Sequence, residues 1–179
     1  GFIVVSGFCL MLPLAERNSL HVSKSYFPNR VRRILPTYYI ALACTLALIW
    51  YSPALWTKHW TRWDIALPAL DPTIIGHHIL LIHNWWPDSM YKINPPFWSI
   101  GVEAQAYILF PLLILPLARI SNLLVSVILC IGLSALPFIP NWAGSGFLQW
   151  TFPWCIGLFG FGAYAAQISV GREKPIRAL

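Results

Sequence analysis

Long apolar stretches take up most of this 179-residue chain. Residues 34–56, 97–118, 122–139 and 147–170 each approach or exceed the roughly 20 residues that a helix needs to cross a bilayer. Charged residues make up only 10% of the chain, against roughly 25% in a typical soluble domain. So few charges cannot cover the surface of a soluble globule of this size. The sequence therefore predicts an all-α fold, a polytopic transmembrane helix bundle that forms a single domain over residues 1–179.

The opening apolar stretch, residues 1–14, is too short to cross a bilayer. No methionine and no basic region precede it, which argues against a signal peptide. We expect it to be the remainder of a truncated span, so that the bundle is partial and the chain is a fragment of a longer protein.

Residues 57–96 do not fit a simple span. Their longest apolar run, residues 73–86, is about 14 residues long and carries three histidines. That length favours a re-entrant or interfacial segment at about 65–86 over a crossing. If residues 57–96 do not cross the membrane, nine basic residues lie on one side of it and three on the other. If they cross, six basic residues lie on each side. The positive-inside rule favours the first arrangement, with the loop that carries Arg30 in the cytoplasm and a bent crossing as the alternative.

The basic residues, which give the chain a formal net charge of +6, lie between the apolar stretches. Positive charge in such loops orients a membrane protein, so we expect no nucleic-acid partner. The four cysteines lie inside apolar stretches without CxxC spacing, and the spacing of His77, His78 and His83 does not place three ligands around one ion. The sequence therefore predicts neither a disulfide framework nor a metal site.

Glu103 is the only acidic residue within a confidently predicted span. A carboxylate at the middle of a membrane helix costs roughly 2.5–3.5 kcal/mol on insertion scales, so such a residue is a functional candidate. At helical spacing Ser99 and Tyr107 share its face, which is typical of a helix that lines a cavity. The alternative is that Glu103 pairs with a neighbouring group only for packing.

Arg30 and Arg33 are three residues apart, so a helix would present both on one face. Two guanidinium groups on one face suit phosphate, because each can pair bidentately with phosphate oxygens. The alternative is an anchor at lipid headgroups. His83, beside Asn84 and a tryptophan pair, is either part of a polar pocket or an interfacial histidine.

Residues 1–10, 29–39 and 94–113 hold Arg30, Arg33 and Glu103 and the apolar residues around them, and these three stretches resemble motifs of the membrane acyltransferase-3 family, which includes bacterial O-antigen acetylases. GFIVVSGFCL (residues 1–10) is similar to the family's F-F-V-L-S-G-F helix. NRVRRILPTYY (residues 29–39) is similar to R-x-x-R-I-x-P-x-Y-Y and places the arginines at Arg30 and Arg33. NPPFWSIGVEAQAYILFPLL (residues 94–113) is similar to W-S-L-x-V-E-x-Q-F-Y-x-x-F-P and places the acidic residue at Glu103. The resemblance covers about residues 1–118.

The resemblance implies an integral, multi-pass membrane enzyme that moves an acyl group, usually acetyl, from cytoplasmic acyl-CoA to a hydroxyl of a saccharide or lipid-linked glycan. It implies no permanently bound cofactor, with membrane lipid and the glycan acceptor as partners. The expected location is a bacterial inner membrane, with animal members of the family as the alternative. Family members carry a catalytic histidine in the helix before the S-G-F segment, and none of the five histidines lies at that place. We therefore expect the fragment to be inactive alone.

On this basis we expect catalytic roles for Glu103 and Ser99. The residues expected to contact the acceptor are Trp98, Tyr107, His83 and Asn94, and those expected to bind the phosphates of acyl-CoA are Arg30 and Arg33. Two other functions stay open: a transporter or flippase that uses the intramembrane Glu103, and a non-catalytic relative that binds lipid or glycan. The sequence makes no prediction of the oligomeric state.

Overall fold

The computed structural model describes residues 1–52, 54, 64, 70–120, 123–135 and 154–170. All regular elements in these ranges are helical, and none of these residues forms a strand. The predicted all-α class is therefore confirmed. Contacts divide the chain into two units, one made of residues 1–26 with 105–179 and the other of residues 27–104.

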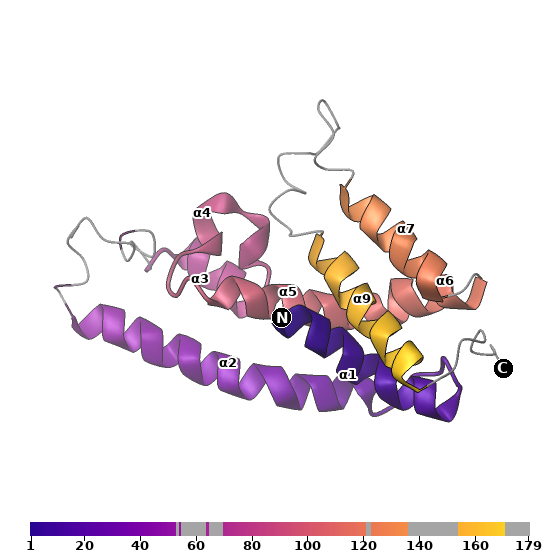
Figure 1. Cartoon of the computed structure of the whole chain (residues 1–179). Helices are drawn as coiled ribbons and strands as arrows, with labels where there is room; N and C mark the ends of the chain where they lie inside the picture. Colours follow the sequence, from indigo (N-terminus) through magenta and orange to yellow (C-terminus); the bar gives the residue numbers. More distant parts are fainter. Residues whose placement is uncertain (53, 55–63, 65–69, 121–122, 136–153, 171–179) are drawn as a thin grey trace. The chain divides into compact units, whose positions relative to one another are not determined.

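In the first unit, helix α1 (Phe2–Arg17) packs along helix α9 (Trp154–Ser169), and the two lie side by side in Figure 1. Glycines at the crossing bring their backbones together. A Cβ added at Gly7 would overlap the carbonyl of Phe159, and one added at Gly162 would overlap the carbonyl of Val4. Small residues allow this kind of close contact between membrane helices, where dispersion rather than water exclusion holds the pair together.

A π-helical turn, η4 (Phe110–Ile114), follows helix α5 (Phe97–Leu109) and leads into α6 (Leu115–Ile120). Pro111 explains the break in the α-helical pattern, because it has no N–H to donate to the carbonyl of Tyr107 four residues earlier. The hydroxyl of Tyr26 donates to that carbonyl instead, at 3.0 Å. The rings of Tyr26 and Phe110 also stack, with centroids 6.3 Å apart. One buried tyrosine thus compensates for the proline.

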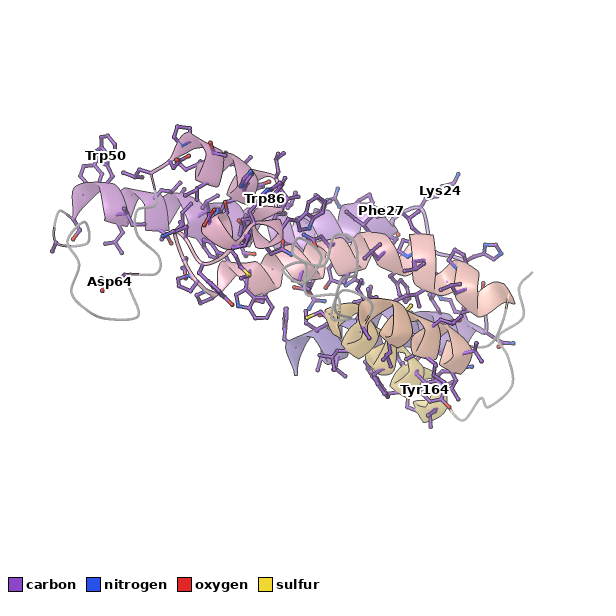
Figure 2. The ribbon with its side chains drawn as sticks, turned by 90° about the horizontal axis from the view of Figure 1, so that it is seen from above. Lys24, Phe27, Trp50, Asp64, Trp86 and Tyr164 are labelled. Atoms are coloured by element: carbon purple, nitrogen blue, oxygen red, sulfur yellow. The ribbon has the colours of Figure 1, made fainter. Side chains whose placement is uncertain are left out.

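The second unit contains α2 (Tyr26–Tyr51) except its first residue, and this single helix of 26 residues is long and apolar enough to cross a membrane. The continuous helical stretch Phe97–Ala118 also passes this test, whereas the apolar helix Cys155–Ser169 is shorter. Helix α2 begins eight residues before the expected span 34–56, so its arginines are helical. Trp50 projects outward near its C-terminal end (Figure 2), with 66% of its surface exposed, as expected of an aromatic residue at a membrane interface.

Short helices connect α2 to α5: α3 (Pro72–Ile79), the 3-10 turn η3 (His83–Trp85) and α4 (Pro87–Met90). The Asp71 side chain caps α3 by accepting from the backbone N–H groups of Thr73 (2.7 Å) and Ile74 (3.4 Å). None of the described helices between α2 and α5 exceeds eight residues, too few to cross a bilayer. The first residues of the expected re-entrant segment, 65–69, lie outside the described ranges.

Helix α7 (Leu123–Ala135) lies within the expected span 122–139, and α9 lies within 147–170. Residues 136–153, which include the remaining parts of both spans, lie outside the described ranges. The membrane boundaries themselves stay predictions.

Candidate functional site

Arg30 and Arg33 lie in the first two turns of α2, where Arg30 is half-buried and Arg33 is exposed. The first turn of this helix carries no acidic side chain to offset the positive end of its dipole. The N-terminal part of α2 therefore combines a partial positive charge with two guanidinium groups. Such an end attracts anions, and phosphate above all.

Glu103 lies in the second turn of α5 and is buried, with 4% of its surface exposed. Its neighbours Val102 and Ala106 are equally buried, so this part of α5 faces the protein interior. Ser99, one turn earlier, is half-buried, and its hydroxyl donates to the carbonyl of Pro96 at 2.9 Å. The serine thus makes a local bond in the first turn of the helix.

The residues expected to contact the acceptor occupy different places. Trp98 and Asn94 are half-buried at the start of α5. Tyr107 belongs to the first unit, where its ring meets that of Phe159 edge-on with centroids 6.5 Å apart. His83 is completely buried in the second unit. The four residues thus belong to two units, and their roles stay predictions.

The sequence did not single out the surroundings of His83. Its ring stacks on that of His78, with centroids 4.1 Å apart and planes 9° from parallel. Tyr38 stacks on the His83 ring at 6.5 Å, and its hydroxyl donates to the backbone carbonyl of His78 at 2.9 Å. Phe97 meets both Tyr38 and His78 edge-on. Three elements, α2, α3 and α5, thus close around one pair of imidazoles.

Burial keeps both rings of this pair neutral. Desolvation, with a smaller contribution from the neighbouring His78, lowers the pKa of His83 to about 3. Desolvation also lowers the pKa of His78, although the carbonyls of Ile74 and Lys92 act in the opposite direction. Both histidines lie between the two candidate spans and are uncharged at neutral pH.

Backbone carbonyls lie against both rings of this pair. Those of Ile74 and Lys92 act on His78, and those of Phe97 and His77 act on His83. His77, by contrast, is half-buried. Its Nδ1 atom lies 2.8 Å from the hydroxyl of Ser89, and its ring stacks on Trp86, which is labelled in Figure 2. Within the described ranges no three metal-ligating side chains gather.

The stacked pair of His78 and His83 is formed by a backbone feature that cannot be predicted from the spacing of the two residues in the sequence. The chain leaves α3 through Leu81, a non-glycine residue in the left-handed region with φ of 57°. This turn brings residue 83 back over residue 78. Glycine at position 101 lets α5 approach the same turn, because a Cβ there would lie 3.2 Å from the Cε1 atom of His83. Tyr38 and Tyr39 both donate to backbone carbonyls at the end of α3. This adjacent tyrosine pair is the sequence feature that could have indicated the contact between α2 and α3.

Comparison with models of known protein families finds a match. A family model described as an acyltransferase domain matches residues 1–178. The match therefore extends well beyond residue 118, where the motif resemblance ends. Neither the curated proteins nor the solved structures contain a match to the chain.

Proposed function

The chain belongs to the acyltransferase-3 family, and on that premise we propose that it is part of an integral membrane O-acyltransferase. The proposed reaction moves an acetyl group from acetyl-CoA to a hydroxyl of a saccharide or lipid-linked glycan. The family match over residues 1–178 is the observation that carries this proposal. A bacterial inner membrane is the proposed location, with several helices crossing it.

The chemistry requires a base for the attacking hydroxyl and stabilisation of charge at the thioester carbonyl. In the proposed enzyme the base is the histidine that family members carry upstream of the segment matched by residues 1–10. Glu103 orients an active-site group or accepts a hydrogen bond from the acceptor hydroxyl. Its burial, with 4% of its surface exposed, supports this role, because an unused carboxylate in an apolar interior is costly.

In the same proposal, the N-terminal part of α2 binds the phosphates of the acyl-CoA donor. Arg30 and Arg33 lie on one face of that helix, whose first turn has no acidic residue to compete for them. Arg32, which is also exposed, lies between them in the sequence and on another face of the helix. It therefore serves as a matched control for charge alone.

The test uses the full-length protein in membranes, labelled acetyl-CoA, and envelope glycan from cells that lack the gene. Wild-type protein should label the glycan. Arg33→Ala should raise the KM for acetyl-CoA about tenfold, the loss expected for one charge-assisted phosphate contact, while Arg32→Ala should leave it within about twofold. Glu103→Gln should lower kcat with little effect on that KM. Wild-type protein that transfers no label, or a Glu103→Gln variant as active as wild type, would exclude the corresponding proposal.

A further inference from the structure

We propose that one outer face of α2 contacts lipid directly and that Arg32, at one end of this face, binds the phosphate of an anionic phospholipid. The lipid face is formed by Arg32, Tyr39, Ala43 and Trp50, all of which are exposed. They follow one another at intervals of seven, four and seven residues, so the helix presents them on the same side. The site depends on the membrane location of the chain and not on acyl transfer.

Helix α2 has little protein around it. Only 22% of its most apolar stretch is buried, against 44% for the helical stretch Phe97–Ala118. Beyond Arg33 its buried side chains follow one side of the helix; they are Ile34, Tyr38, Leu42 and Ile49. The lipid face lies away from this side. Helix α2 therefore packs on protein along one side and presents the lipid face outward.

The stretch between the two ends of the lipid face suits a hydrocarbon environment. Residues 34–51 contain no charged residue. The hydroxyls of Thr37 and Thr45 donate to backbone carbonyls of α2 itself, at 3.1 Å and 2.8 Å. Those of Tyr38 and Tyr39 donate to backbone carbonyls at the end of α3, at 2.9 Å and 2.7 Å. Each hydroxyl between residues 34 and 49 thus has a protein acceptor, as a segment without access to water requires.

The two ends of the lipid face are separated by about the thickness of a bilayer core. Trp50 follows Arg32 by 18 residues, which is about five helical turns and about 27 Å along the axis. The hydrocarbon core of a typical bilayer is about 30 Å thick. Trp50, labelled in Figure 2, and the adjacent Tyr51 are 66% and 82% exposed, as suits aromatic residues at the level of the headgroups. With Trp50 at one interface, Arg32 lies at the other.

Arg32 has no anionic partner along its own helix, because residues 26–51 include no acidic residue. Its guanidinium group is a planar fork of donors that pairs bidentately with phosphate oxygens. Lipid phosphate is the anion present at this depth, and a negatively charged headgroup attracts a basic side chain at the membrane surface. Arg30 and Arg33 lie on another face of α2. The lipid site is therefore separate from the proposed donor site.

Full-length protein in mixed micelles, titrated with phosphatidylglycerol, tests the site, with native mass spectrometry counting the bound lipid. Arg32→Gln should weaken binding about fivefold, the loss expected for one basic residue at a membrane surface. Arg32→Lys keeps the charge and should stay within about threefold of wild type. Arg33→Gln is the matched control, because it removes an exposed arginine from another face, and it should stay within about twofold. Before lipid is added, all three variants should unfold at the wild-type temperature, since both side chains are exposed.

Inorganic phosphate distinguishes a lipid site from a site for a soluble anion. At constant ionic strength it should not displace phosphatidylglycerol from wild-type protein, because it has no acyl chains to lie along α2. Displacement by inorganic phosphate, or equal weakening by Arg32→Gln and Arg33→Gln, overturns the proposal. Binding that Arg32→Gln leaves at the wild-type level also overturns it, and another protein segment then covers this face. The titration uses neither acyl donor nor acceptor, so a protein that transfers no acetyl group loses the proposed function but not this site.

Discussion

Gly101 of α5 lies directly against the turn that carries His83. A Cβ at position 101 would come within 2.9 Å of the Oδ1 atom of Asn84 and within 3.2 Å of the Cε1 atom of His83. The helix can therefore approach the imidazole pair only because residue 101 has no side chain. This contact links a glycine near the start of a predicted span to the buried polar centre of the second unit.

Replacing this glycine should destabilise the protein. Gly101→Ala forces Asn84 or His83 to move, and we expect the free energy of unfolding to fall by about 1–3 kcal/mol. The control is Gly76→Ala in α3, where nothing lies within 4 Å of the added atom. Alanine there should be neutral or stabilising by up to about 1 kcal/mol, because it favours the helix. Thermal unfolding in detergent measures both, and equal midpoints in the two variants would contradict the close contact.

Removing the hydroxyl of Tyr26 should also reduce stability. In Tyr26→Phe, the buried carbonyl of Tyr107 loses a donor that Pro111 cannot replace, at an expected cost of about 1–3 kcal/mol. Ser23→Ala is the control, because its hydroxyl lies 2.9 Å from that of Ser25 at an exposed position before α2. Water can take over that bond, so the loss should be below about 1 kcal/mol. Chemical unfolding in mixed micelles gives the comparison, and an equal loss in both variants would exclude the compensating role of Tyr26.

The crossing of α1 and α9 should tolerate no side chain at Gly162. A Cβ there would overlap the backbone of α1, which cannot move aside as a side chain can. We expect Gly162→Ala to reduce the free energy of unfolding by about 3 kcal/mol or to prevent accumulation of the protein in membranes. Gly132→Ala in α7, where the added atom meets nothing within 4 Å, should accumulate as the wild type does. Normal accumulation and stability of Gly162→Ala would mean that the helices are further apart.

The imidazole pair should make stability depend on pH. The pKa of His83 is lower in the folded protein, about 3, than the ordinary value of 6.5, so below pH 6.5 the unfolded chain binds the additional proton. The contribution of neutral His83 to the free energy of unfolding is therefore complete above pH 6.5. The free energy of unfolding falls as the pH decreases toward 3, with a slope of up to about 1.4 kcal/mol per pH unit. Unfolding measured from pH 7 to pH 5 should show this decrease in wild type and in His77→Phe. In His83→Phe the slope should be smaller, and an unchanged slope would assign the effect to other groups.

Much of the architecture could be predicted from the sequence. Apolar length and the scarcity of charge predicted the helical class, and the structure confirms it. The motifs predicted the family, which the match over residues 1–178 shows. Glu103 was found because a carboxylate stands out within an apolar helix, and the structure buries it. In each case the property belongs to a continuous stretch of sequence.

The imidazole pair could not be predicted in this way. His83 was expected to contribute to a polar pocket, but nothing in its spacing from His78 indicates a stacked pair. Stacking requires the left-handed turn at Leu81, and leucine is not a residue that predicts such a turn. The role of Tyr26 was missed for a similar reason, since its partner carbonyl lies 81 residues away in the sequence. Long-range contacts and unusual backbone angles leave no local pattern.

The π-helical turn at Phe110–Ile114 has a consequence for comparing this chain with its relatives. Such a turn holds one more residue than an α-helical turn of the same height. A helical wheel drawn over residues 97–118 as one regular helix is therefore rotated by about one residue, roughly 100°, beyond the turn. An alignment without a gap at this point would pair residues that face different directions. In evolutionary terms, the turn is equivalent to the insertion of one residue, and Pro111 marks its position in the sequence.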